Sequence, residues 1–255
     1  MPSPIPPFFH KWRPGPGTGV PTYTAQSDLD VALRAGHGEF PRIVIAPGDA
    51  VEAIENTNEA FYLSEKFNSL SIILSDKHIA ESKFSFNKNS RKYLKINSAR
   101  KIPGKGIVKT SSNEHDSFGN TTEDSRLAEK NALARIEKYK MMKKECEKFD
   151  MIKLHGNLKS KNLIVGWGSM KPAILDAIRD LDFKFLQVIY LKPLSDKIKD
   201  EMNKAKKIIL VEGNVTGQLG RLIREKTGLK IENRILKYDG RPFNSDELRK
   251  ELMKI

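Results

Sequence analysis

The stretch KNLIVGWGSMKPAILDAIRDL, residues 161–181, contains the pattern that decides the fold class. A short apolar run predicts a buried strand that ends in the glycine-rich turn VGWGS, residues 165–169. A helical pattern follows at once, with Pro172 in its first turn, where proline is tolerated. A strand, a tight turn and a helix in this order are the repeating unit of α/β sheets.

The same alternation continues to the end of the chain. FLQVIYL (185–191) and KKIILVEGN (206–214) predict strands, and the helix LSDKIKDEMNKA (194–205), capped by Ser195, lies between them. TGQLGRLIREKTG (216–228) predicts a helix that Thr216 caps and Gly228 stops. ILKYDGRPF (235–243) and a short helix complete a predicted doubly wound α/β domain.

A second α/β pattern precedes it. PRIVIAP (41–47) and LSIILSD (70–76) predict buried strands, and a helix capped by Asp49 connects them. Strand, helix and strand at this spacing form a βαβ unit, so the strands should be parallel. The polar residues 82–122 predict an extended connector. A long helix follows over 122–149, capped by Thr122 or Asp124, with an apolar stripe of Leu127, Leu133, Ile136, Tyr139 and Met142.

The composition is that of a globular protein, with 38% hydrophobic and 30% charged residues. No apolar run approaches the ~20 residues of a membrane span, and the prolines of MPSPIPPFFHK interrupt any signal-peptide pattern, so a cytoplasmic location is expected. Cys146 is the single cysteine, which excludes an internal disulfide. It lies in a charged helical stretch without a positioned base, so we expect it to be a bystander.

The net charge of +13 raises the question of a nucleic-acid partner. The densest basic stretch, residues 83–109, holds no acidic residue and interleaves Phe84, Phe86 and Tyr93 with its cations. That mixture suits single-stranded nucleic acid. A charged surface of a heat-adapted protein or an acidic partner subunit explains the charge equally well, and no known binding module organises these residues. Nucleic acid is therefore not the expected partner.

Three features invite a chemical interpretation, each with a structural alternative. VGWGS resembles a dinucleotide-binding turn but lacks the third glycine, which favours a simple tight turn. His115 stands between Glu114 and Asp116 and could bind metal or exchange protons, but a solvated turn explains the trio as well. Glu212 ends a strand at the sheet edge where ligands bind, yet it could equally cap the next helix or pack in an interface.

The loop RPGPGTGVPT, residues 13–22, is the sharpest binding candidate. Arg13 can offer a forked donor to a carboxylate, while the glycines let backbone N–H groups approach a ligand. Thr18 and Thr22 add hydroxyl groups.

Several motifs in one order resemble a known family. The motifs are RPGPGTGVPTYTAQSDLDVAL (13–33), GHGEFPRIVIAPGD (36–49), LSDKHIAE (74–81), NEHDSFGNTTED (113–124), LIVGWGS (163–169), VEGNVTGQLGRLIREKTG (211–228) and ILKYDGRPF (235–243). In this order they are similar to the α subunit of 2-oxoacid:ferredoxin oxidoreductases, above all the archaeal type with fused γ and α parts. The resemblance runs from Trp12 to Phe243.

The resemblance implies an enzyme that decarboxylates a 2-oxoacid on thiamine diphosphate, reduces ferredoxin through an iron–sulfur cluster and forms an acyl-coenzyme A. It implies an α/β heteromer whose β subunit mainly holds the thiamine diphosphate, its magnesium and the cluster. None of these cofactors is expected on this chain alone, and a cluster needs several thiolates where this chain has one. The resemblance places Arg13 and Thr22 at the substrate carboxylate, and it assigns no catalytic or metal-binding residue here.

The family's Tyr-Pro-Ile-Thr-Pro segment, which precedes this loop in relatives, is not in the sequence. We therefore expect a C-terminal part of an α subunit, inactive on its own. The expected fold is an incomplete pyrimidine-type domain of thiamine-diphosphate enzymes, followed by a doubly wound domain like the transketolase C-terminal domain. The expected divisions are an irregular segment (1–11), the pyrimidine-type part with its connector (12–122), a long helix and linker (123–156), and the C-terminal domain (157–255). The alternative is an inactive assembly or nucleic-acid-binding module.

Overall fold

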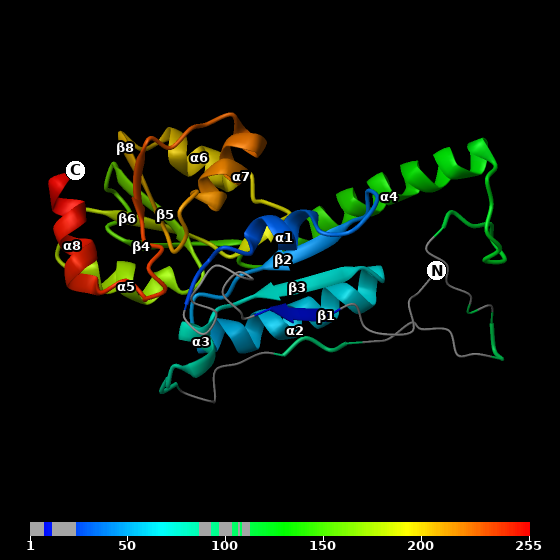
Figure 1. Ribbon diagram of the computed structural model, residues 1–255, viewed down its shortest axis with the longest axis horizontal. Helices are drawn as coiled ribbons and strands as arrows, with labels where there is room; N and C mark the ends of the chain where they lie inside the picture. The colour runs from blue at the N-terminus through cyan, green and yellow to red at the C-terminus, as the bar shows by residue number, and fades with distance from the viewer. Residues whose placement is uncertain (1–7, 12–23, 87–92, 97–103, 107, 109–112) are drawn as a thin grey trace.

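The computed structural model describes residues 8–11, 24–86, 93–96, 104–106, 108 and 113–255. These residues form two mixed sheets that meet near the middle of the molecule, with helices packed around them (Figure 1). None of the helices within these ranges is both long and apolar enough to cross a membrane.

The first sheet has the strand order β1-β3-β2-β7. Its strands are β1 (Phe8–Lys11), β2 (Arg42–Ile45), β3 (Leu70–Leu74) and β7 (Tyr190–Lys192). β1 and β2 run parallel to β3, whereas β7 is antiparallel to β2. Helix α2 (Ala50–Phe67) connects β2 to β3, so the predicted parallel βαβ unit is confirmed. As predicted, Asp49 caps this helix, and its carboxylate accepts the N–H of Glu52 at 2.8 Å.

The N-terminal segment departs from the expectation. Residues 1–11 were expected to be irregular, but Phe8–Lys11 forms β1, in register with Ser71 to Leu74 of β3. The four prolines of MPSPIPPFFHK all precede these residues in the sequence. β1 also lies at the edge of the described sheet, where a nearby proline costs no ladder hydrogen bond.

The second sheet has the order β4-β6-β5-β8-β9, with β4 antiparallel and the remaining pairs parallel. Its strands are β4 (Ile152–Gly156), β5 (Asn162–Trp167), β6 (Lys184–Val188), β8 (Lys207–Glu212) and β9 (Asn233–Leu236). Its helices are α5 (Met170–Ala177), α6 (Lys197–Asn203), α7 (Gln218–Thr227) and α8 (Ser245–Lys254). The predicted α/β alternation is confirmed. Strand β4 was not predicted from the sequence.

The predicted single strand FLQVIYL is wrong. Residues 184–188 form β6 of the second sheet, and Tyr190–Lys192 crosses to pair with β2 of the first. Ile189 lies at the crossing, where its carbonyl accepts the N–H of Ala46 at 2.8 Å. Residues 184–191 are buried throughout, and uniform burial gives no periodicity that could reveal a change of sheet.

Two predicted helix caps also differ. α6 begins after Asp196 rather than Ser195, and α7 begins after Gly217 rather than Thr216. Gly217 adopts φ 64°, and the Asn214 side chain accepts the backbone N–H groups of residues 216 to 218. The asparagine thus supplies the capping oxygen expected from Thr216. Gly228 ends α7 in the left-handed conformation, as predicted.

The long helix α4 (Ser125–Cys146) is capped by Asp124, which confirms one of the two predicted caps. Its predicted apolar stripe is only partly buried. Met142 is fully buried, but Leu133 and Ile136 are 56% and 54% exposed. The first half of α4 extends away from both sheets (Figure 1), so helical periodicity there does not mark a core face.

The short helices α1 (Leu29–Arg34) and α3 (Lys77–Glu81) precede β2 and follow β3. The largest apolar cluster draws on both sheets, since it joins Leu29 and Val44 to Leu163, Val165 and Leu210. The division of the chain near residue 157 stays a prediction, although β7 lies outside the sheet to which that division assigns it.

Candidate functional site

A crevice lies where the carboxyl ends of β3 and β5 approach each other. Asp76 follows β3 and Ser169 follows β5, and the Ser169 hydroxyl donates a hydrogen bond to the Asp76 carboxylate. Both residues are 4% exposed. The other carboxylate oxygen of Asp76 accepts the N–H of Ile79 at 3.2 Å and so caps α3. The carboxyl edge of parallel strands is where α/β proteins bind ligands.

Gln26 closes one wall of this crevice. Its side-chain N–H group donates to the carbonyl of Trp167 at 2.8 Å, and its side-chain oxygen accepts the N–H of Gly213 at 2.8 Å. Its own carbonyl accepts from Asn214 at 3.1 Å. Gly168 adopts φ 55°, and a Cβ there would lie 2.9 Å from the Gln26 amide nitrogen. The glycine turn therefore makes room for Gln26.

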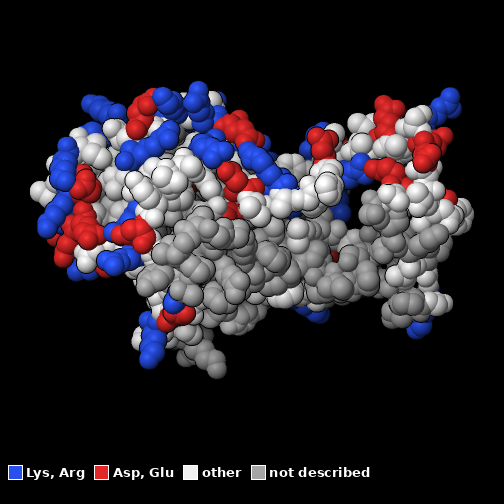
Figure 2. All heavy atoms as spheres, in the orientation of Figure 1, with Lys and Arg blue, Asp and Glu red and all other residues white. Residues whose placement is uncertain are grey.

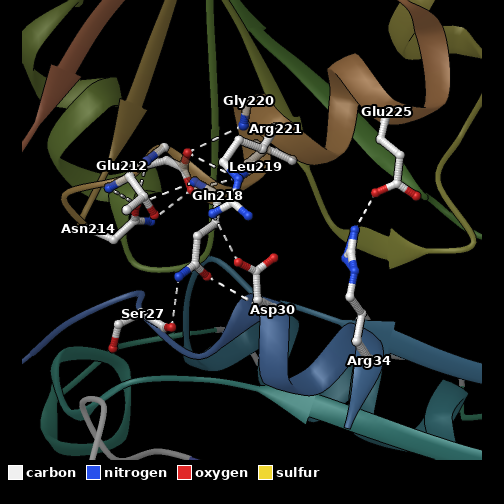
Figure 3. A network of polar contacts seen from close by, with 12 residues as sticks. Ser27, Asp30, Arg34, Glu212, Asn214, Gln218, Leu219, Gly220, Arg221 and Glu225 are labelled. Carbon is white, nitrogen blue, oxygen red and sulfur yellow. Dashed lines mark hydrogen bonds and ion pairs between the residues drawn. The ribbon is translucent and has the colours of Figure 1, made fainter.

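The polar network behind this wall is built on Glu212 (Figure 3). Its carboxylate accepts from the Trp167 indole at 2.8 Å and from Asn214 at 3.0 Å. It also accepts the backbone N–H of Leu219 at 3.0 Å, in the first turn of α7. Burial raises the pKa of Glu212 in spite of these hydrogen bonds. The capping role, one of the alternatives left open for Glu212, is therefore the one that the structure supports.

A second polar cluster lies where α2 and α5 begin. Lys171 forms ion pairs with Asp49 and, at 2.7 Å, with Glu52. Glu52 also pairs with Lys153 at 3.1 Å and accepts from the N–H of Gly48 at 2.7 Å. Burial alone would raise the pKa of Glu52, but Lys171, the N–H of Gly48 and the charge of Lys153 together outweigh burial and bring the pKa to about 2. The cluster ties the first sheet's helix to the second sheet's helix.

The same cluster extends towards the protein surface. Gln187 donates to Glu52 at 2.6 Å, and its side-chain oxygen lies 2.9 Å from the half-buried His155 ring. Gly48 must be glycine here, because a Cβ would lie 2.6 Å from Lys171 and 2.7 Å from Gln187. Since every acid in the cluster has a partner, the arrangement fixes geometry rather than offering a free base.

The predicted substrate residues Arg13 and Thr22 lie outside the described residues. The described residues on either side are Lys11, in register with Leu74 of β3, and Thr24, whose N–H donates to Gly240 at 3.0 Å. Both flanking positions are at the carboxyl edges of the sheets. The placement of Arg13 and Thr22 at a substrate carboxylate stays a prediction.

The other sequence candidates have structural roles. Asp116 accepts the N–H groups of Phe118 and Asn120 and so closes a turn, while Glu114 pairs with Arg135 of α4 at 2.7 Å. Cys146 is fully buried, and burial raises its pKa to about 12, so the thiol is unreactive, as expected. In the part of the chain that the structure describes, no three His, Cys, Asp or Glu side chains gather as a metal site.

Four residues of these clusters were not predicted as site residues from the sequence: Gln26, Asp76, Ser169 and Lys171. Asp49 and Glu52 carried a signal, since an acidic residue three positions after a cap is typical of a helix start. Nothing in the sequence pairs Glu52 with Lys171 or Asp76 with Ser169, because about a hundred residues separate the members of each pair.

The fold and the crevice define an α/β protein with its polar groups at the carboxyl edges of parallel strands. A family model described as "Pyruvate flavodoxin/ferredoxin oxidoreductase, thiamine diP-bdg" matches residues 7–148, more than half of the chain. The chain belongs to this family of thiamine-diphosphate-binding proteins.

Similar proteins agree with that assignment. The chain is 33% identical, over 95% of its length, to subunit alpha of 2-oxoacid:ferredoxin oxidoreductase 1 from Sulfurisphaera tokodaii, and 34% identical, over 93%, to the 2-oxoacid:ferredoxin oxidoreductase subunit alpha of Saccharolobus solfataricus. It spans 43% and 42% of those relatives' lengths. The 2-oxoglutarate:ferredoxin oxidoreductase of Magnetococcus marinus has the same fold, with a TM-score of 0.79 at 24% identity, over 97% of this chain and 48% of that chain.

Proposed function

We propose that the chain is part of the α subunit of a 2-oxoacid:ferredoxin oxidoreductase. The complex would decarboxylate a 2-oxoacid, transfer the acyl group to coenzyme A and pass two electrons to ferredoxin. The observation that carries this proposal is similarity along nearly the whole chain to α subunits named for that reaction. This chain would supply substrate-carboxylate contacts from Arg13 and Thr22 and an interface for the β subunit.

The crevice residues indicate which part of a ligand they could contact. Ser169, Asp76 and Gln26 offer a hydroxyl, a carboxylate and an amide. Thiamine diphosphate, when bound, supplies the carbanion chemistry of decarboxylation. In this structure the three side chains hydrogen-bond to one another or to the backbone, so a ligand would bind them only by replacing one of those contacts.

We assign the magnesium diphosphate and the iron–sulfur cluster mainly to the β subunit. A cluster requires several cysteine thiolates, whereas this sequence has one cysteine, which is buried at the C-terminal end of α4. The expected complex is thus a heteromer in which this chain holds the carboxylate of the substrate, while its partner holds the cofactors.

The test is an activity assay on the reconstituted complex. The chain is co-expressed with the β subunit and with the remaining α-subunit segment, and 2-oxoacid-dependent ferredoxin reduction is measured. Arg13→Ala should lower kcat/KM for the 2-oxoacid roughly 10- to 100-fold, since a charge-assisted hydrogen bond contributes about 1.5–3 kcal/mol. Lys92→Ala removes a positive charge from the basic stretch and should leave kcat/KM unchanged. Equal activity of Arg13→Ala and wild type would refute the assigned site.

A non-enzymatic role, as an assembly or nucleic-acid-binding module, is the second candidate. In its favour, Phe86 and Tyr93 of the basic stretch are 48% and 64% exposed. Against it, basic and acidic side chains are interspersed on the face of the described residues seen in Figure 2, without a continuous basic stripe. A salt-dependent RNA mobility shift, abolished by changing Arg91, Lys92 and Lys95, would support it. No shift at low salt would exclude the nucleic-acid form.

A further inference from the structure

An apolar pocket with a cationic rim lies between α1, α7, β7 and the base of α4, and we call it the cationic pocket. Its apolar lining consists of Leu33, Leu191, Leu194, Leu222 and the ring of Tyr139. Arg34, Lys192 and Lys226 stand at its rim together with Glu225. The pocket has a cavity volume of about 100 Å³. It involves none of the residues proposed above for substrate binding.

The charges around this pocket are unbalanced. Glu225 is shared by Arg34 and by Lys226, whose Nζ lies 2.9 Å from it (Figure 3 shows the contact to Arg34). Lys192 donates to the carbonyl of Leu33 at 3.3 Å, and within the described residues it forms no ion pair with a carboxylate. Three cations at the rim therefore face one carboxylate, a local excess of two positive charges.

A fourth cation adds to this excess from within the protein. Arg42 is 3% exposed and donates to the carbonyls of Ala32, at 3.2 Å, and Ala35. No carboxylate pairs with Arg42 among the residues that the structure describes, and its buried Nε makes no hydrogen bond. Burial lowers the pKa of Lys192, and the charges of Arg42, Lys226 and Arg34 lower it further. Arg34 and Lys226 are exposed, but Lys192 is half-buried and Arg42 is buried, and cations in such settings are normally paired. An anion bound beside Lys192 would supply that missing partner.

We propose that the cationic pocket binds a small amphipathic organic anion. Its carboxylate or phosphate head would lie between Lys192 and the two cations paired with Glu225, which are Arg34 and Lys226. A short apolar group would pack on Leu194, Leu222 and the Tyr139 ring. The apolar lining distinguishes this pocket from a surface cluster of lysines, because a ligand with a hydrocarbon group next to its charge would bind more tightly here than a bare anion. The inference does not depend on the proposed enzymatic function.

The binding of hexanoate to the 255-residue chain tests the proposal, with hexyl phosphate, hexanol and inorganic phosphate as the other probes. Binding is followed by calorimetry and by the methyl NMR signals of Leu194 and Leu222. Hexanoate or hexyl phosphate should bind at least tenfold more tightly than hexanol and than inorganic phosphate, and should shift both methyl signals. The stronger of the two ligands identifies the head group.

Two variants and a control locate the site. Lys192→Met keeps the apolar stem and should weaken hexanoate binding tenfold or more, while Lys192→Arg retains the charge and should stay within about threefold of wild type. Lys250→Met removes an equal charge from exposed α8 and should have no effect. Equal affinity for hexanol and hexanoate, or unshifted Leu194 and Leu222 signals in the wild type, would overturn the proposal even if Lys192→Met failed to fold.

Discussion

Glu52 shows how one buried charge is kept ionised by its neighbours. Its side chain is 3% exposed, a setting in which a lone carboxyl group would take up a proton. Two lysines and the N–H of Gly48 reverse that tendency. Because its partners belong to α5 and β4, the charge of Glu52 also joins the two halves of the molecule.

The pH dependence of stability should carry the signature of this residue. The pKa of Glu52 lies near 2 in the folded state, below the ordinary value of 4.5, so its stabilising contribution is complete above pH 4.5 and is lost as the pH falls towards 2. The shift corresponds to about 3 kcal/mol. The free energy of unfolding of wild type should fall between pH 5 and pH 2. In Glu52→Gln that fall should be about 3 kcal/mol smaller, as measured by urea denaturation at both pH values.

The matched control is Glu251→Gln, which changes an exposed carboxylate paired with Lys254. Surface ion pairs contribute little, so this variant should follow the wild-type pH profile to within about 1 kcal/mol. Identical slopes for wild type and Glu52→Gln would show that Lys171 and Lys153 do not hold this carboxylate charged.

At the scale of the elements, the turn between β5 and α5 joins the second sheet to residues 24–28. The positive φ of Gly168 lets the chain turn while leaving room for Gln26. The Gln26 side chain reaches the ends of both β5 and β8. The sequence predicts only a tight turn between a strand and a helix here. In the structure, the same turn also binds residues 24–28 through Gln26.

Gly168→Ala should therefore cost more than backbone strain alone. An alanine at φ 55° is strained, and its Cβ would also displace the Gln26 amide from the Trp167 carbonyl. We expect a loss about 1–3 kcal/mol larger than for Gly228→Ala, since a buried hydrogen-bonding group would lose its partner. Gly228 has φ 78°, and no atom lies within 4 Å of the Cβ that an alanine would add. Gly228→Ala therefore measures the cost of the backbone strain alone. Equal losses in urea denaturation would contradict the role given to Gln26.

At the scale of the whole molecule, the two sheets share the largest apolar cluster. Leu29 and Val44 from the first half pack in the same cluster as Leu163 and Leu210 from the second. β7 adds a covalent crossing, because residues 190–192 leave the second sheet to pair with β2. A core shared in this way should make the two halves unfold together.

Leu29→Ala tests that cooperativity. Leu29, the first residue of α1, is fully buried, and its truncation should destabilise the protein by about 2–5 kcal/mol. The transitions seen by far-UV circular dichroism and by Trp167 fluorescence, measured in a Trp12→Phe background, should shift together. Leu158→Ala, at a position that is 60% exposed, should shift neither. A Trp167 transition that stays in place while the first half melts earlier would show two independent units.

The local pattern determined the α/β class, the helix start at Asp49, the parallel βαβ unit and the stop at Gly228. Each of these depends on neighbouring residues, through hydrophobic periodicity, a capping side chain or a permissive glycine. The family is likewise indicated by the order of the motifs, which is a property of the sequence alone. The cap at Asn214 was not predicted, because several polar residues at this turn could each cap α7. The folded backbone decides which of their side chains reaches the free N–H groups.

Tertiary structure alone decided which sheet receives Tyr190–Lys192, which half of α4 is buried, and which charges meet. A uniformly apolar run does not indicate which sheet each of its residues joins. An apolar stripe on a helix does not indicate whether another part of the protein packs against it. The ion pair of Glu52 with Lys171 and the excess of cations around Lys192 arise because packing brings distant residues into a medium where charges interact strongly.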